Sequence, residues 1–171
     1  MHYEIIEKMF KGENPSSVLE VGCAVGGLMK DLCNDRGDLR VGGFDIHAGD
    51  IKGAKELFPK YADNFFIHDA FDPWPIPDNS YDIVFTVGFF TILERPPHTI
   101  EFAIREMLRV CKDKIILAED HNTVENTWQT DDFCRAIRDY QKIFDGMGLS
   151  ITIEQAIFDK AVIKCQKVKK N

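Results

Sequence analysis

The sequence lacks the cysteine spacing of a disulfide framework or a zinc site. Its five cysteines are widely separated, odd in number and without any C-x-x-C pair. They are Cys23, Cys33, Cys111, Cys134 and Cys165. The sequence therefore predicts reduced, mostly buried thiols and no metal site.

Long apolar runs are also missing. The longest uncharged apolar stretch, Ile83–Leu93, has 11 residues, whereas a membrane-spanning helix needs about 20. The first ten residues include Glu4, Glu7 and Lys8 and contain no unbroken apolar region, which excludes an ordinary signal peptide. We therefore expect a cytoplasmic protein that does not contact a membrane.

Positive charge is scarce. Lysine and arginine total 21 against 28 acidic residues, which gives a formal net charge of −7. Part of the positive charge is a solvated cluster in the C-terminal tail, at Lys164, Lys167, Lys169 and Lys170. Because an acidic body repels polyanions, a nucleic acid partner is disfavoured and a small molecule is favoured. A protein substrate stays open.

The 171 residues fit one domain. Short runs rich in Val, Ile and Phe alternate with longer runs of helical spacing, which predicts β-α units around a parallel sheet. The expected strands are Ser17–Val21, Leu39–Asp45, Asn64–His68, Tyr81–Val87 and Lys114–Glu119. The expected helices are Gly26–Asn34, Asp50–Phe58, Thr99–Cys111 and Thr130–Met147.

The last segment has a different pattern. Ile151–Phe158 and Ala161–Val168 are separated only by Asp159-Lys160, which is too short for a parallel crossover and suits a hairpin. The prediction is a doubly wound, mostly parallel seven-stranded α/β sheet that ends in an antiparallel hairpin, with helices on both faces. We expect a single domain over residues 1–171, with an N-terminal segment (1–16), a ligand-binding core (17–120) and a final helix and hairpin (121–171).

A glycine turn follows the first expected strand. It can be interpreted as a degenerate G-x-G-x-x-G with Ala24 in the middle position, or as acid-x-G-x-x-x-G through Glu20, Gly22 and Gly26. The first pattern is typical of dinucleotide binding. However, a carboxylate at position 20 would repel a pyrophosphate, whereas it would attract the sulfonium and ammonium groups of S-adenosylmethionine.

At this point the sequence resembles the class I S-adenosylmethionine-dependent methyltransferases. The run Glu20–Gly26 matches their first motif, although Ala24 and Val25 stand where the family most often has Gly and Thr. The resemblance continues in order over residues 17–120. It implies that Asp45 binds both ribose hydroxyls and that Asp69 and Ala70 bind the adenine edge. The full expected cofactor set is Glu20, Gly22, Cys23, Ala24, Gly26, Asp45, Ile46, Asp69, Ala70 and Thr86.

The resemblance also implies the activity, an in-line transfer of methyl from S-adenosylmethionine to a small-molecule acceptor. His121, after the fifth expected strand, is the candidate general base. The acceptor pocket is expected between the loops Gly88–His98 and Asp120–Gln129. The candidate apolar walls are Trp128, Phe89 and Tyr3, and they would suit a small aromatic or heterocyclic acceptor.

Two other functions stay open at this stage. One is a non-catalytic S-adenosylmethionine-binding or scaffold protein, because Ala24 and Val25 depart from the motif and no base is clearly marked. The other is an NAD-dependent oxidoreductase, which would retain the glycine turn but would have to accommodate Glu20 and the lack of a substrate domain. A turnover assay would distinguish a methyltransferase from the non-catalytic protein, and a cofactor-binding assay would distinguish it from the NAD-dependent oxidoreductase.

Overall fold

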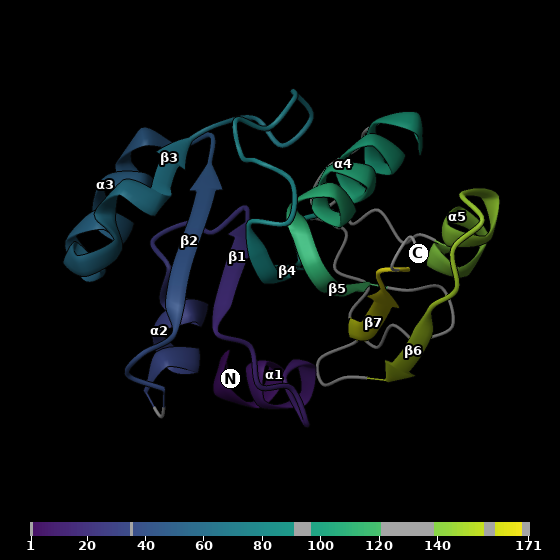
Figure 1. The fold of residues 1–171 in the computed structure, drawn as a ribbon, viewed down its shortest axis with the longest axis horizontal. Coiled ribbons are helices and arrows are strands. Elements are labelled where there is room, and N and C mark those ends of the chain that lie inside the picture. Colours follow the sequence, from purple (N-terminus) through teal and green to yellow (C-terminus); the bar gives the residue numbers. More distant parts are fainter. Residues whose placement is uncertain (1, 35, 91–96, 121–138, 156–159, 169–171) are drawn as a thin grey trace, which may run out of the picture.

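The computed structural model describes residues 2–34, 36–90, 97–120, 139–155 and 160–168. These residues form a seven-stranded sheet in the order β3-β2-β1-β4-β5-β7-β6 (Figure 1). The strands are β1 Ser17–Val21, β2 Arg40–Asp45, β3 Phe65–Ile67, β4 Tyr81–Val87, β5 Cys111–Asp120, β6 Thr152–Gln155 and β7 Lys160–Gln166. β1 to β5 pair in parallel, and β7 is antiparallel to both β5 and β6. The α/β sheet with its terminal hairpin is confirmed.

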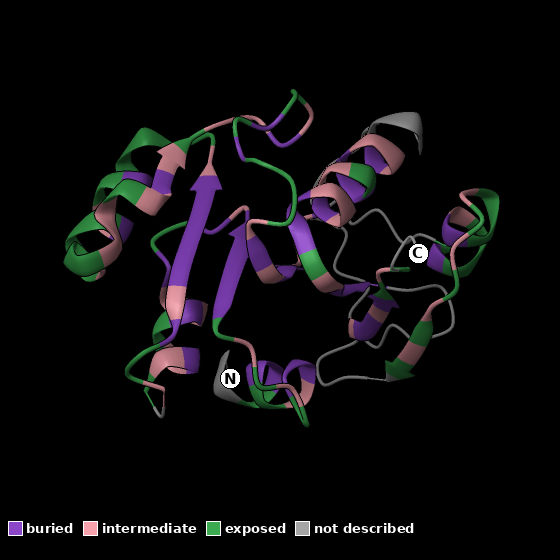
Figure 2. Ribbon diagram, in the orientation of Figure 1, coloured by how far each residue is buried: buried purple, intermediate pink, exposed green. Residues whose placement is uncertain are grey.

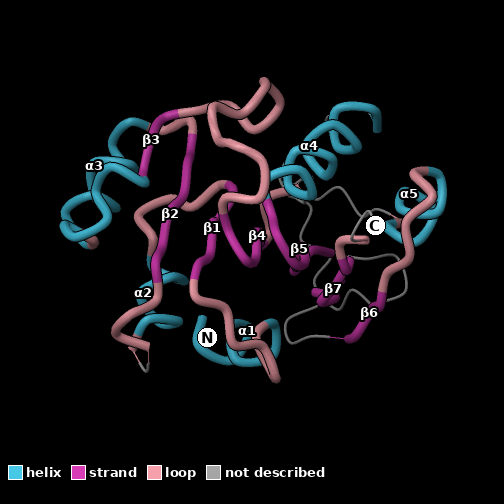
Figure 3. The backbone as a smooth tube through the Cα atoms, in the orientation of Figure 1, coloured by secondary structure: helices cyan, strands magenta, loops and turns pink. Residues whose placement is uncertain are grey.

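Helices cover both faces of the sheet (Figure 3). They are α1 His2–Met9, α2 Gly27–Cys33, α3 Ala48–Leu57, α4 Pro97–Val110 and α5 Tyr140–Gly146, with a short 3-10 turn, Pro59–Asn64, before β3. One buried cluster packs α4 and α5 on the sheet, and a second packs α1, α2 and α3 on its other side. None of the described helices has the length and apolar content needed to cross a membrane.

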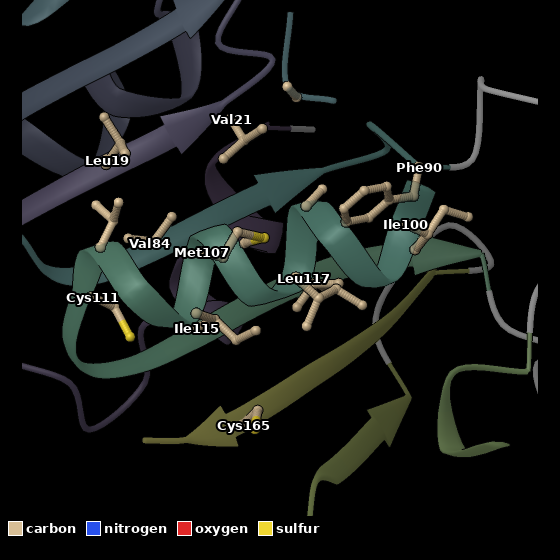
Figure 4. Packing of buried hydrophobic residues seen from close by; sticks show 14 of the residues in the cluster. Leu19, Val21, Val84, Phe90, Ile100, Met107, Cys111, Ile115, Leu117 and Cys165 are labelled. Carbon is tan, nitrogen blue, oxygen red and sulfur yellow. The ribbon is translucent and has the colours of Figure 1, made fainter. Parts of the chain in front are cut away.

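The central strands are buried on both sides, which explains their nearly continuous apolar sequence (Figure 2). All five residues of β1 are buried, including Ser17 and Glu20. On one face, Ile100 and Met107 from α4 lie in the same cluster as Leu117 from β5 (Figure 4). This packing fixes the carboxyl ends of β1, β4 and β5 relative to one another.

Some predicted boundaries are wrong. β7 begins at Lys160, so Lys160 belongs to this strand and not to the expected Asp159-Lys160 turn, and residues 156–159 lie outside the described residues. α4 ends at Val110 and β5 begins at Cys111. Lys112 and Asp113, which lie between the expected helix and the expected strand, therefore belong to β5. The helix expected over 130–147 is present from Tyr140, and residues 130–138 lie outside the described residues.

One helix was not expected. α1 carries Ile5, Ile6 and Met9, which are buried against the second core cluster. Its eight residues have a short amphipathic pattern, and no helix was expected within the N-terminal segment 1–16. Since α1 also contacts α2 and β5, it brings Ile5 to the same side of the sheet as the glycine turn.

Candidate functional site

The turn after β1 has the left-handed backbone that its glycines suggest. Gly22, Ala24 and Gly26 have φ angles of 68°, 44° and 78°. A Cβ on Gly22 would lie 2.3 Å from Cδ2 of Phe89, so position 22 needs glycine for both its conformation and its space. Ala24 adopts a positive φ with a methyl group, a conformation that costs about 1–2 kcal/mol.

Two sets of hydrogen bonds hold this turn against β2. The backbone N–H groups of Gly22 and Cys23 donate to the carbonyl oxygen of Phe44 at 3.0 and 3.1 Å. The Oδ2 atom of Asp45 accepts from the Ala24 N–H at 3.1 Å, and its Oδ1 atom accepts from the His47 N–H at 3.0 Å. An ionised carboxylate has about four acceptor positions, so Asp45 retains capacity for further donors while it orders the turn.

Glu20 lies beneath the turn and is only 2% exposed. Its Oε2 atom is buried, and no described group donates a hydrogen bond to it. Burial, and then the negative charge of Asp45, raise the pKa of Glu20 well above its ordinary value. A buried carboxylate in this state gains from any cation or donor that enters beside it.

Cys23 completes the buried part of the turn. Burial, and then the charges of Glu20 and Asp45, raise the pKa of its thiol far above the ordinary value. The thiol is therefore neutral and a poor nucleophile. A Cβ on Gly43 would come within 2.8 Å of the Cys23 sulfur, so Cys23 packs directly on β2.

These residues line a cleft of about 640 Å³ at the carboxyl ends of β1, β2 and β4. Its polar wall carries Glu20, Asp45, His47, Asp50 and Lys160. Its apolar and backbone wall comprises Ile5, Gly22, Cys23, Ala24, Val25, Gly27, Leu28, Ile46, Val87, Gly88 and Phe89. The structure thus brings Phe89, an expected wall residue, next to the glycine turn.

A smaller cavity of about 60 Å³ adjoins this cleft and shares Gly22, Asp45, Ile46 and Phe89 with it. Asp69 and Ala70 contribute to its lining, as do Phe44, His68 and Phe71. The structure therefore brings the segments after β1, β2 and β3 to one continuous surface. Of the expected cofactor set, Gly26 is not among the lining residues, and it instead shapes the turn at the start of α2.

Asp69 also has a structural role. Its Oδ1 atom accepts a hydrogen bond from the Phe71 N–H at 2.9 Å, which caps the turn after β3. The ring of Phe71 stacks on that of Phe89 with their centroids 6.0 Å apart. The cap keeps Asp69 and Ala70 at the small cavity, and a role in binding adenine stays a prediction.

Thr86 is separated from the other expected residues. It is fully buried and does not line either cavity. Its hydroxyl donates to Oε1 of Glu119 at 3.4 Å, and the same oxygen accepts from the Phe89 N–H at 3.0 Å. Thr86 and the Phe89 N–H therefore share one carboxylate oxygen, and a role of Thr86 in cofactor binding stays a prediction. Side chains alternate between the two faces of a strand, and at position 86 of β4 the side chain is directed into the core.

Sequence reasoning missed Glu119 and Lys160. Both are near the sheet's carboxyl edge, but only the pairing of β5 with β7 brings Lys160 there, opposite Asp120. An acidic pair that ends an apolar strand, Glu119-Asp120, was the available signal. His121 and Trp128 lie outside the described residues, as does the side chain of Tyr3.

Comparison with known proteins gives a consistent assignment. Residues 18–114 match the methyltransferase domain family. The 2-methyl-6-phytyl-1,4-hydroquinone methyltransferase of Synechocystis sp. is 32% identical over 123 residues, which are 67% of this chain and 36% of that protein. The chain thus spans about a third of the length of this relative.

Two solved structures share the fold. A chain in the complex between the Haloferax volcanii Trm112 methyltransferase activator and a methyltransferase superimposes with a TM-score of 0.73 at 18% identity, over 97% of this chain and 90% of that chain. A SAM-dependent methyltransferase from Aquifex aeolicus gives 0.70 at 18% identity, over 98% and 92%. The family match covers more than half of the sequence, and the glycine turn and strand order agree with it, so the chain belongs to the methyltransferase domain family, among the class I S-adenosylmethionine-dependent methyltransferases.

Proposed function

We propose that this protein binds S-adenosylmethionine in the cleft and methylates a small-molecule acceptor. The observation that carries the proposal is Glu20, whose buried Oε2 atom has no donor among the described residues and which lines the cleft. Such a carboxylate fits a ligand with a cationic sulfonium and ammonium. It does not fit a pyrophosphate, and this weighs against the NAD-dependent alternative.

The remaining residues suit the other parts of this cofactor. Asp45 has acceptor capacity for the two ribose hydroxyls. Asp69, Ala70 and Ile46 line the small cavity that adjoins the cleft, which supports assigning them to the edge of the adenine. The turn from Gly22 to Gly26 lets the ligand approach the backbone. The bound cofactor supplies an electrophilic methyl group for in-line transfer. The residues of this chain hold and orient it and exclude water.

The acceptor is proposed to be a small aromatic or heterocyclic molecule. The name of the Synechocystis relative refers to a hydroquinone, and the cleft continues from Glu20 to the apolar residues Val87 and Phe89. The formal net charge of −7 weighs against a polyanionic acceptor. His121 stays the candidate base, and its replacement by Ala is expected to lower turnover by about 10²-fold with cofactor affinity unchanged.

Calorimetry with S-adenosylhomocysteine and NAD, titrated separately into the same preparation, tests the cofactor. We expect S-adenosylhomocysteine to bind with micromolar or tighter affinity, roughly −8 kcal/mol, and NAD not to bind. Binding of NAD alone would overturn the proposal. If S-adenosylhomocysteine binds but no methyl is transferred to any member of a panel of phenols, thiols and amines, the protein is a non-catalytic binder.

A further inference from the structure

A lysine and a buried carboxylate form a pair on the β5–β7 side of the cleft, and in the sheet order β4 separates these strands from β1. Lys160 opens β7 opposite Asp120, the last residue of β5. The Lys160 ammonium lies 3.4 Å from Oδ1 of Asp120, whose side chain is only 1% exposed. The Lys160 side chain is 21% exposed and lines the cleft beside Gly88 and Phe89.

Charge is distributed unevenly along the cleft. The carboxylates of Glu20, Asp45 and Asp50 come from β1, from β2 and from α3. Among the described residues that line it, Lys160 carries the cleft's fixed positive charge. The acidic part suits the cationic cofactor, so the cationic part is left for a group of opposite charge on another ligand.

We propose that Lys160 binds the ionised hydroxyl oxygen of the methyl acceptor, and that the acceptor is therefore a phenol or an enol taken up as its oxyanion. This inference rests on the proposed function, because it assigns the acceptor part of the same cleft. The hydroxyl proton leaves through the candidate base to solvent on binding, and the oxygen retains the electron pair. An oxyanion is a stronger nucleophile than its neutral hydroxyl, so the contact favours methylation.

The geometry holds the ammonium in a fixed place. Asp120 takes one of the three N–H donors of Lys160, which leaves two for an acceptor oxygen. Gly88 allows the close approach, because a Cβ at this position would lie 3.2 Å from the Lys160 nitrogen. Gly88 also has a φ of 63°, which favours glycine. Asp120 is thus a positioning residue, and Lys160 is the residue that contacts the acceptor.

An amine acceptor does not fit this end of the cleft. Its ammonium form would be repelled by Lys160, and its neutral form would gain less from the contact than an oxyanion does. Several titratable groups among the described residues share the cleft with Lys160 or contact it, and their charges act on the same ligand. They are Asp120 from β5, Glu20 and Cys23 from β1 and its turn, and Asp45, His47 and Asp50 from β2 and α3.

The experiment uses 4-nitrophenol, whose ionised form absorbs visible light, and 4-nitroanisole, the same ring without an ionisable hydroxyl. Both are titrated into the full chain with and without saturating S-adenosylhomocysteine, and the absorbance of bound 4-nitrophenol is followed against pH. The variants are Lys160→Gln, which removes the charge, and Lys160→Arg, which retains it. The matched control is Lys112→Gln, since Lys112 pairs with Asp82 at 3.1 Å outside the cleft.

We expect the wild-type protein to lower the pKa of bound 4-nitrophenol by at least one unit, which is a tenfold preference for the phenolate. Lys160→Arg and Lys112→Gln should retain that preference, and Lys160→Gln should lose it while its affinity for 4-nitroanisole stays the same. An unshifted pKa in the wild type, no binding of 4-nitrophenol, or a shift that survives in Lys160→Gln would overturn the inference.

The result also separates this inference from the proposed function. If S-adenosylhomocysteine does not bind but phenolate selection depends on Lys160, the cofactor assignment fails and the anion site stands. If S-adenosylhomocysteine binds to the wild type and to Lys160→Gln alike while phenolate selection is absent, the cofactor assignment stands and the anion site fails.

Discussion

Two acidic residues at opposite ends of the central strands, Asp82 and Glu20, have opposite surroundings. At the amino edge, Asp82 accepts hydrogen bonds from the N–H groups of Ser16 and Ser17 at 2.8 and 3.0 Å and pairs with Lys112. At the carboxyl edge, the Oε2 atom of Glu20 lacks a donor among the described residues. One carboxylate joins strands to each other, and the other is held in an environment that disfavours its charge.

The pKa directions follow this difference. Burial by itself would raise the pKa of Asp82 and of Glu13. Hydrogen bonds with Lys112, the Ser16 N–H and Ser17 lower the pKa of Asp82, and Lys114 and Lys164 lower that of Glu13. Burial and Asp45 raise the pKa of Glu20. Asp82 and Glu13 at the amino ends of the strands therefore stabilise the fold. Glu20 at the carboxyl ends is a buried carboxyl whose ionised form is unfavourable, and a cationic ligand would relieve this.

Replacing Asp45 with Ala gives the largest expected effect on the carboxyl edge. It removes two charge-assisted hydrogen bonds to the ribose, each worth about 1.5–3 kcal/mol, so the affinity for S-adenosylhomocysteine should fall at least tenfold by calorimetry. The melting temperature should also fall, because the N–H groups of Ala24 and His47 lose their acceptor. Wild-type affinity in this variant would contradict the ribose assignment.

Replacing Asp82 with Ala is the matched change at the amino edge. The N–H groups of Ser16 and Ser17 lose their acceptor and Lys112 loses its partner, so the free energy of unfolding should drop by about 2 kcal/mol. Urea unfolding measures this drop. The affinity for S-adenosylhomocysteine should stay within twofold of the wild type, and a tenfold loss of affinity would show that the two edges are not separate.

Glu20→Gln tests the contribution of the Glu20 charge to cofactor binding. The variant retains the size of the side chain but cannot interact with a sulfonium as a carboxylate does. We expect the affinity for S-adenosylmethionine to fall about tenfold, which is 1.4 kcal/mol, and that for S-adenosylhomocysteine, which has no sulfonium, to fall less. Equal losses for the two ligands would contradict an interaction of Glu20 with the sulfonium, because both ligands carry the ammonium.

The pH dependence of unfolding should show the smallest effect. Carboxylates with a lowered pKa, Glu13, Asp82 and Glu106, stabilise the fold above their unfolded pKa and lose that contribution as the pH falls through their folded values. Glu20 acts in the opposite direction. Its raised pKa means that stability declines as the pH rises above about 4.5, the unfolded value, until the folded pKa is passed.

The stability of Glu20→Gln relative to the wild type should therefore increase as the pH rises above the ordinary glutamate range, as measured by thermal unfolding between pH 4 and pH 8. A constant difference across this range would mean that Glu20 ionises normally in the folded protein. Asp82→Asn is the control, since the pKa of Asp82 is lowered from 3.8 and this variant should therefore be less stable than the wild type by a nearly constant amount over the same range.

The sequence was sufficient to predict those features that depend on local pattern. β1 and β4 were predicted with their observed bounds, because each is a buried strand next to a clear turn. Asp45 and the glycine turn could be placed at one edge of the sheet, since parallel strands end together. These features require only the order of the elements.

Features that depend on the pairing of distant strands could not be predicted. Lys160 reaches the cleft because β7 returns antiparallel along β5, and its sequence position suggested only a hairpin turn. Thr86 belongs to the cofactor set that was expected from the sequence. The structure instead directs it to Glu119, from a strand about thirty residues later in the chain. One position along a strand reverses the face of a side chain.

A crystal structure of the protein with S-adenosylhomocysteine bound tests the central claim most directly. The account predicts the ribose hydroxyls within hydrogen-bond distance of the Asp45 carboxylate, the adenine beside Asp69 and Ala70, and the sulfur on the Glu20 side of the cleft. A ligand bound outside the cleft, or one bound in the cleft with its ribose away from Asp45, would contradict it.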